Sequence, residues 1–218
     1  MFAAKTFAVM TPDFRIGIDF DNTIITYEAV FCAMAKRLGL IAPDFSGNKR
    51  AVRDAIRLLP DGEIAWQRLQ GGVYGKGIAE ATMVEGFAAF LRRARAAGGA
   101  VAIVSHKTEY GHYDPDRVNL RSVALDWLEM QNLIDETSGV PRSGIYFEST
   151  REEKLKRIAA LSLTHFIDDL EEVLSDPGFP PDVTRILIAD EKPEPAVPYA
   201  VCSTWRDIER LIFPGTAA

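Results

Sequence analysis

Two aspartates, Asp19 and Asp21, follow a short apolar run near the start of the chain and are separated by one residue. Side chains two positions apart on an extended segment point to the same side, so both carboxylates can face one pocket. One carboxylate can attack phosphorus and form an aspartyl phosphate, while the other protonates the leaving oxygen and then deprotonates water. The alternative is a simple turn made by Asn22 and Thr23. The position directly after a predicted buried strand favours the chemical interpretation.

A second pair of acids, Asp168 and Asp169, ends another apolar run. Adjacent carboxylates at the end of a strand repel one another unless a cation lies close to both. Mg²⁺ prefers oxygen ligands of this kind. Capping of the following helix by one of the two aspartates is the competing explanation.

Thr23, after the first pair of aspartates, is a candidate phosphate ligand, and further candidates lie at two other places. Ser105 and His106 end a third apolar run, and Lys154 lies near the start of a predicted helix. A serine hydroxyl with its neighbouring backbone N–H can bind a phosphoryl oxygen, and an ammonium group can neutralise its charge. A lysine in the first turn opposes the helix dipole, which indicates a role other than helix stability. A capping serine and a solvated lysine are the competing explanations, and Lys156 and Arg157 are alternative candidates for the same role.

Short, continuous apolar runs recur along the chain and predict strands that are buried on both faces. They are Arg15–Phe20, Ala100–Ser105, Gly144–Glu148, Thr164–Asp168 and Arg185–Ala189, with Ala200–Cys202 as a weaker sixth. Apolar residues at helical spacing lie between them, as in 83–94 and 120–128, and Thr150 with Glu153 forms a capping-box pattern. This alternation predicts an α/β fold with a doubly wound parallel sheet. Ligands bind beyond the carboxyl ends of such strands, where the polar clusters lie.

The first two predicted strands are separated by far more residues than one crossover helix needs. Residues 25–81 are therefore interpreted as an inserted helical subdomain, which leaves residues 1–24 and 82–218 as the core. Helices are expected at Tyr27–Leu38, Lys49–Leu59 and Glu63–Leu69. The glycines between 71 and 77 predict a flexible hinge where the insert returns to the core.

Side chains that recognise a substrate are expected in the insert and in the loop 107–116, which starts at the edge of the sheet where the polar clusters gather. The candidates are Lys49, Arg53, Gln70 and Tyr74 in the insert, and Lys107 and His112 in the loop. An ammonium group in this loop can meet a second anionic group of the substrate. Packing of the loop against the insert is an equally weighted alternative.

Four segments, in this order, resemble the motifs of the haloacid dehalogenase superfamily of phosphohydrolases: DFDNT at 19–23, Ser105 after AVAIV, Lys154, and IDD at 167–169. The resemblance covers residues 15 to about 213 and implies a Rossmann-like core with 25–81 as a mobile cap. It implies that Asp19 is the nucleophile and Asp21 the acid and base. It also implies Mg²⁺ bound by Asp19, the backbone carbonyl of Asp21, and Asp168 or Asp169. Superfamily dehalogenases lack an acid at the position of Asp21, so a phosphatase or phosphotransferase is expected.

The overall composition narrows the class of protein. The 218 residues include 31 acidic and 25 basic side chains, for a net charge of −6, which argues against a nucleic-acid or membrane-surface binder. No apolar run approaches the length of a membrane span, and the two cysteines form no disulfide or metal pattern. We therefore expect a cytoplasmic Mg²⁺-dependent phosphatase that acts on a small phosphorylated metabolite. A phosphotransferase or mutase, and a non-catalytic binding domain that retains the site, are the alternatives.

Overall fold

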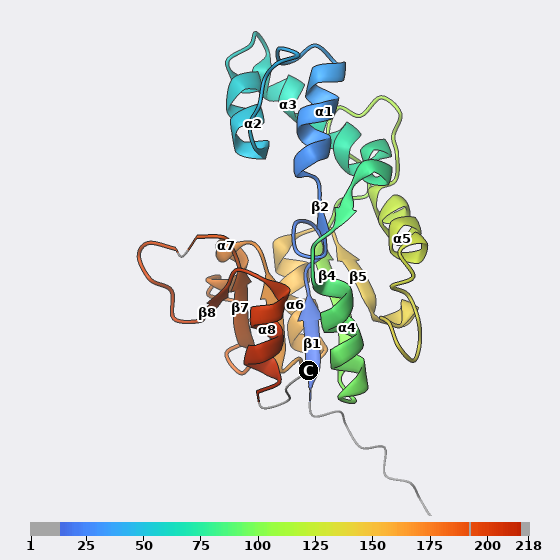
Figure 1. Cartoon of the computed structure of the whole chain (residues 1–218), viewed down its shortest axis with the longest axis vertical. Helices are drawn as coiled ribbons and strands as arrows, with labels where there is room; N and C mark the ends of the chain where they lie inside the picture. The colour runs from blue at the N-terminus through green and yellow to red at the C-terminus, as the bar shows by residue number, and fades with distance from the viewer. Residues whose placement is uncertain (1–13, 192, 215–218) are drawn as a thin grey trace, which may run out of the picture.

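The computed structural model describes residues 14–191 and 193–214, and its centre is a sheet of six parallel strands. The strands are β1 (Arg15–Ile18), β4 (Ala100–His106), β5 (Ile145–Glu148), β6 (His165–Asp168), β7 (Thr184–Ile188) and β8 (Ala200–Cys202). Their spatial order is β5-β4-β1-β6-β7-β8 (Figure 1). Each predicted apolar run forms one of these strands, and the predicted Rossmann-like α/β fold is confirmed.

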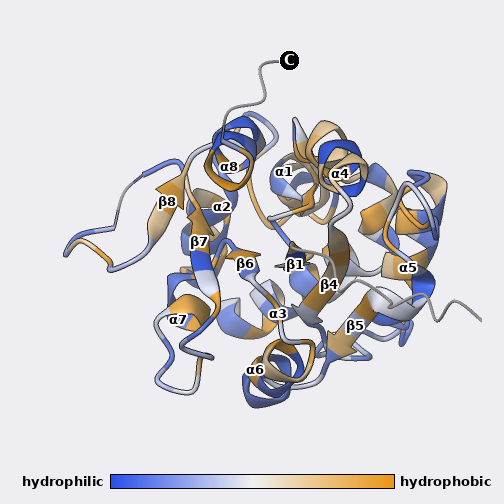
Figure 2. Cartoon of the chain, turned by 90° about the horizontal axis from the view of Figure 1, so that it is seen from below, coloured by the Kyte–Doolittle hydropathy of each residue, from blue (hydrophilic) through white to orange (hydrophobic). Residues whose placement is uncertain are grey.

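Helices cover both faces of this sheet because its strands bury side chains on both sides. Neighbouring strand residues divide between two apolar clusters: Ile103 and Ile167 belong to one, Val104 and Phe166 to the other. The first cluster includes residues of α4 (Phe87–Ala96), α5 (Leu120–Met130) and α8 (Trp205–Ile212), and the second those of α6 (Arg151–Ala160) and α7 (Glu171–Leu174). Figure 2 shows α4 and α8 on one side of the sheet and α6 and α7 on the other. Over the described ranges, no helix combines the length and apolar character that crossing a membrane requires.

The start of α6 is determined by a reciprocal pair of hydrogen bonds. Thr150 Oγ1 accepts from the backbone N–H of Glu153 at 3.1 Å, and Glu153 Oε2 accepts from the backbone N–H of Thr150 at 3.1 Å. The predicted capping box is therefore confirmed. It places Lys154 in the first turn of the helix that follows β5.

Gly17, in the middle of β1, is required by close packing. A Cβ added at this position would lie 2.3 Å from Leu163 Cδ1 and 2.7 Å from Phe166 Cδ2. A larger residue would displace the Phe166 side chain, which belongs to the neighbouring strand β6. This close fit keeps the ends of β1 and β6 together, and both ends carry aspartates.

A group of helices lies beyond the carboxyl ends of the central strands and is connected to the sheet by two short strands (Figure 1). The connecting strands β2 (Ile25–Thr26) and β3 (Thr82–Met83) pair antiparallel. Between them are α1 (Glu28–Arg37), α2 (Lys49–Arg57), α3 (Gly62–Tyr74) and a 3₁₀ helix at Lys76–Glu80. We call this group, residues 28–80, the cap.

Two expectations about local structure are wrong. The predicted glycine hinge at 71–77 is instead the last turn of α3 followed by the 3₁₀ helix, because Gly71 is packed against the loop that contains Gly111. The chain returns to the core through β3. Met83 lies in β3, so it is not part of the helix that was expected to begin there.

Candidate active site

The register of the sheet brings the polar strand ends together. Ile18 of β1 pairs with Ile103 of β4 on one side and with Ile167 of β6 on the other. Asp19 and Asp168 follow Ile18 and Ile167 directly, so they become neighbours, and the backbone N–H of Asp19 donates to Ile167 O at 2.9 Å. Ser105, two residues beyond Ile103, is buried at the end of β4. Residues that are far apart in the sequence thus share one edge of the sheet.

Lys154, from helix α6, contacts two of these carboxylates. Its Nζ donates to Asp19 Oδ1 and to Asp168 Oδ2, each at 2.6 Å. Lys154 is 1% exposed, Asp19 4% and Asp168 0%. Burial alone would lower the pKa of Lys154, but the negative charges of Asp19 and Asp168 outweigh it and the pKa is raised. The ammonium group therefore stays charged and holds both carboxylates in place.

Three carboxylates form a cluster next to this ammonium group: one oxygen from each of Asp19, Asp168 and Asp169 lies within 4.8 Å of the others. Burial raises the pKa of Asp19 to about 7, against the opposing effect of Lys154, and Asp168 raises it further. The pKa of Asp169 is also raised, by burial first and then by the charges of Asp19 and Asp168. Three carboxylates against one ammonium leave two unbalanced negative charges, so the donor set fits one divalent cation with a preference for oxygen.

Asp168 and Asp169 differ in their surroundings. Asp168 Oδ1 accepts the backbone N–H of Leu170 at 2.9 Å and its Oδ2 accepts from Lys154, so both oxygens already have a partner. Asp169 lies beside Asn22, which hydrogen bonds to it, and lines the cavity described below. Both carboxylates belong to the cluster, so both expectations of a metal ligand at this strand end stay predictions.

Asp21 points away from this cluster and has its own partners. Lys107 Nζ lies 2.7 Å from Asp21 Oδ2 and 3.0 Å from Oδ1, and the Tyr27 hydroxyl donates to Oδ1 at 2.8 Å. Lys107 is 4% exposed. No sequence pattern indicated Tyr27, and Lys107 was expected to bind the substrate. The structure places this ammonium group on Asp21, where it fixes the orientation of the second carboxylate.

The position of Lys107 has a signal in the sequence. Ser105 and Lys107 are two residues apart at the end of β4, and period two places them on the same side of an extended segment. His106, between them, is exposed and bonds with its Nε2 to Ser149 O at 3.0 Å. No comparable signal indicates Tyr27, because its approach to Asp21 depends on the turn at Asn22, where φ is 58°.

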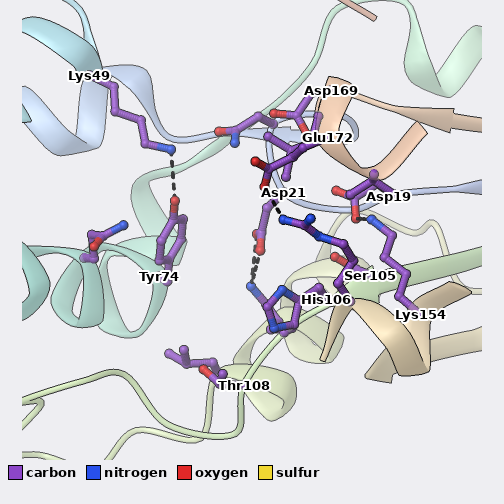
Figure 3. Close-up of a pocket in the computed structure, with 17 residues that line it drawn as sticks. Asp19, Asp21, Lys49, Tyr74, Ser105, His106, Thr108, Lys154, Asp169 and Glu172 are labelled. Carbon is purple, nitrogen blue, oxygen red and sulfur yellow. Dashed lines mark hydrogen bonds and ion pairs between the residues drawn. The ribbon is translucent and has the colours of Figure 1, made fainter. Parts of the chain in front are cut away.

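These residues surround a cavity of about 400 Å³ between the sheet edge and the cap. The predicted residues that line it are Asp19, Asp21, Lys49, Gln70, Tyr74, Ser105, His106, Lys107, Lys154 and Asp169. Figure 3 shows Asp19, Ser105 and Lys154 on one side and Lys49 and Tyr74 on the other, with Asp21 between them. The pocket thus has one side from the sheet and one side from the cap.

Four predicted ligand residues do not line this cavity, and one of them is Asp168, whose side chain is fully buried. Thr23 is fully buried and its Oγ1 lies 3.5 Å from Asp169 Oδ1, so its hydroxyl faces a carboxylate. Arg53 Nη2 pairs with the adjacent Asp54 at 2.8 Å. His112 is exposed. Its loop packs on the cap, where a Cβ added at Gly111 would lie 2.6 Å from Gly71 Cα. Of the expected loop residues, only Lys107 lines the cavity.

The comparisons with known proteins are consistent with this architecture. No family model and no curated protein matches the sequence. A haloacid dehalogenase-like hydrolase from Streptococcus pneumoniae is similar in structure, with 14% identity over 93% of this chain and 100% of the other and a TM-score of 0.55. A predicted phosphoglycolate phosphatase from Haemophilus somnus has 14% identity over 93% and 99%, with a TM-score of 0.54. A dehalogenase has 15% identity over 93% and 98%, with a TM-score of 0.51. The resemblance seen in the sequence is confirmed at the level of architecture: the chain has the fold of the haloacid dehalogenase superfamily.

Proposed function

We propose that this protein is a Mg²⁺-dependent phosphatase that hydrolyses a small phosphorylated metabolite through an aspartyl phosphate on Asp19. One observation carries the proposal: a buried carboxylate, bonded to a buried ammonium group, lines the same cavity as a second, separately held carboxylate. Such a pair suits a nucleophile and a proton-transfer group. The similar structures described as hydrolases support the same class of reaction.

The reaction has two balanced steps. An oxygen of Asp19 attacks phosphorus and forms a P–O bond, while the ester P–O bond breaks and Asp21, in its protonated form, gives its proton to the leaving oxygen. Water then attacks phosphorus as Asp21 takes a proton from it, and the bond between phosphorus and Asp19 breaks. Inorganic phosphate leaves, the Asp19 carboxylate is restored and Asp21 is protonated again. Mg²⁺ held by Asp19, Asp169 and Asp168 would neutralise charge on the phosphoryl oxygens.

Lys154 and Ser105 support this chemistry from the sheet edge. The ammonium group of Lys154 favours the ionised form of Asp19 and orients it, and Ser105, whose side chain is buried at the cavity wall, can donate to a phosphoryl oxygen. Asp21 also distinguishes the proposal from dehalogenation. A leaving ester oxygen needs a proton and a leaving halide does not, so a held second carboxylate favours phosphate esters.

Release of inorganic phosphate from an aryl phosphate and from a panel of small alkyl phosphates tests the proposal. We expect Mg²⁺-dependent release that is abolished by a chelator and restored by added Mg²⁺. Short 2-haloacids serve as the alternative substrates, with halide release as the readout. Halide release without phosphate release would replace the proposal with dehalogenation, and neither product would indicate a binding domain.

Lys107→Met tests the orientation of Asp21. The variant leaves Asp21 with only Tyr27 as a described hydrogen-bond partner. We expect kcat to fall by about 10- to 100-fold, which is part of what a general acid–base group usually contributes. The loss should be larger for alkyl phosphates than for aryl phosphates, because an alkoxide leaving group needs the proton more. Equal losses on both substrates would show that Lys107 acts on structure alone.

The thermal shift produced by Mg²⁺ should depend on pH. At saturation near 100 Kd, binding stabilises by about 2.7 kcal/mol, which raises Tm by roughly 5–10 °C for a chain of this size. The pKa of Asp19 is raised to about 7 in the fold, from 3.8, so without metal its proton is retained below pH 7 and lost above it. Mg²⁺ must displace that proton at pH 6 but not at pH 8.

We therefore expect a larger Mg²⁺ shift at pH 8 than at pH 6, measured by calorimetry or dye-based unfolding. NaCl at matched ionic strength is the control for charge screening. Asp169→Asn should remove most of the shift. An equal shift at both pH values, or an unchanged shift in Asp169→Asn, would argue against a metal site in the cluster.

A further inference from the structure

The cap side of the cavity contains a cation whose role the proposed chemistry leaves open. Lys49 is the first residue of α2, and its Nζ donates to the Tyr74 hydroxyl at 3.0 Å (Figure 3). The same Nζ lies 5.0 Å from the centre of the Phe31 ring and 5.6 Å from that of Tyr74. Aromatic rings thus hold this ammonium group at the wall of the cavity.

This ammonium group lacks a direct counter-ion. Throughout 14–191 and 193–214, no carboxylate forms an ion pair with Lys49. Burial lowers its pKa, and the more distant charges of Asp169, Asp21 and Glu28 offset this only in part. A cation in the first turn of a helix also opposes the dipole. A partly buried cation with unused donors is stabilised by an anion, and the open space next to it is the cavity.

Tyr74 and Gln70 extend this polar wall. The Tyr74 hydroxyl oxygen is bonded by Lys49 and by the Gln70 side chain, so its own proton is available to a ligand. Burial raises the pKa of Tyr74, so the hydroxyl remains a donor at neutral pH. All three residues line the cavity and all lie on the cap. The wall therefore presents a cation and a hydroxyl donor on the side away from Asp19.

From this geometry we infer that Lys49 and Tyr74 bind a second anionic group of the substrate, which is then a small phosphate ester carrying a carboxylate or a second phosphate. This inference rests on the proposed function, because the first phosphate occupies the side of Asp19 and Lys154. The size of the cavity, about 400 Å³, agrees with it. A small ester with two anionic groups fits such a space.

Three matched esters test the inference: 2-hydroxyethyl phosphate, carboxymethyl phosphate and the bisphosphate of ethane-1,2-diol. We expect the wild type to prefer one of the two esters with a second anion by kcat/KM over the hydroxyethyl ester, and which one identifies the anion. Lys49→Met should reduce this preference by about 10- to 100-fold, since one charge-assisted hydrogen bond and its ion pair are lost. Lys49→Arg should recover part of it.

Arg50→Met is the matched control, because Arg50 is an exposed cation on the same helix and does not line the cavity. It should keep the wild-type preference. Hydrolysis of all three esters with equal kcat/KM, or an equal preference in wild type and Lys49→Met, would refute the subsite while leaving the phosphatase intact.

A binding measurement covers the case in which no ester is hydrolysed, which would refute the proposed function. Carboxymethylphosphonate, ethane-1,2-bisphosphonate and ethylphosphonate, which resist hydrolysis, are compared by thermal shift in the presence of Mg²⁺. One of the two phosphonates that carry a second anionic group should stabilise the wild type more than ethylphosphonate does. This difference should disappear in Lys49→Met. Equal shifts for all three phosphonates would refute the subsite as well.

Discussion

Asp19→Asn is expected to lower turnover by at least about 10³-fold, because the amide cannot attack phosphorus and no covalent intermediate forms. The substitution keeps the shape of the side chain and a partner for Lys154, which lies 2.6 Å from Asp19 Oδ1. It also removes one of the three clustered carboxylates, whose burial opposes the charged form. Steady-state phosphate release, compared with the wild type at equal protein concentration, measures the loss.

Trapping of the intermediate separates the nucleophile from a general effect on the site. Acid-quenched wild type, mixed with a radiolabelled substrate, should carry label that hydroxylamine removes, as an acyl phosphate does. Asp19→Asn should carry none, while its thermal unfolding should show that the fold is retained. Turnover above a tenth of the wild-type value in a folded Asp19→Asn protein would refute the mechanism.

Lys154→Met is expected to have the largest effect on stability. Asp19 and Asp168 are 4% and 0% exposed, and without the ammonium group both become buried charges with no counter-ion. Breaking a buried ion pair by removing one partner costs about 3–5 kcal/mol, which corresponds to a fall in Tm on the order of 10 °C. Turnover should also fall, because the same ammonium group orients the nucleophile.

The pH dependence of this loss follows from the carboxylates. Burial raises the pKa of Asp19 and Lys154 opposes this, so in the variant the deficit is small at low pH, where Asp19 is protonated, and grows as pH rises. In the wild type the raised pKa of Lys154 keeps its contribution present throughout the neutral range. Unfolding midpoints at pH 5 and pH 8 measure the difference between the two proteins.

Lys156→Met on the same helix is the matched control. The side chain of Lys156 is 71% exposed and pairs with Glu152 four residues earlier, whereas that of Lys154 is 1% exposed. Exposed pairs of this kind contribute little. We expect almost no change in Tm or turnover. Similar effects of both substitutions would show that the buried contacts of Lys154 are not responsible.

Much of the core could be predicted because its signals are local. The apolar runs around Ile18, Ile103 and Ile167 are strands because both faces of a parallel sheet exclude water, and Thr150 with Glu153 starts a helix through bonds within four residues. The rule that ligands bind beyond the carboxyl ends of parallel strands then placed Asp19, Ser105 and Asp168 together. Helices are also found at the three places where they were expected in the insert.

The errors arose where the outcome depends on contacts between distant segments. The glycines at 71–77 favour a hinge on local propensity, but packing of Gly71 against Gly111 holds them in helical structure. Arg53 pairs with Asp54 and His112 is exposed, and neither lines the cavity, so their contacts with a substrate stay predictions. Local propensity does not encode packing between distant segments.

By itself, the sequence determined the chemical identity of the site: the carboxylate pair Asp19 and Asp21, the acids at 168 and 169, and the order in which they follow buried strands. Only the tertiary structure decided which ammonium group pairs with which carboxylate. Lys154 contacts Asp19 across 135 positions of the chain, and Lys107 contacts Asp21 across 86. The physical reason is that pairing of charges depends on strand order and register, which long-range packing sets.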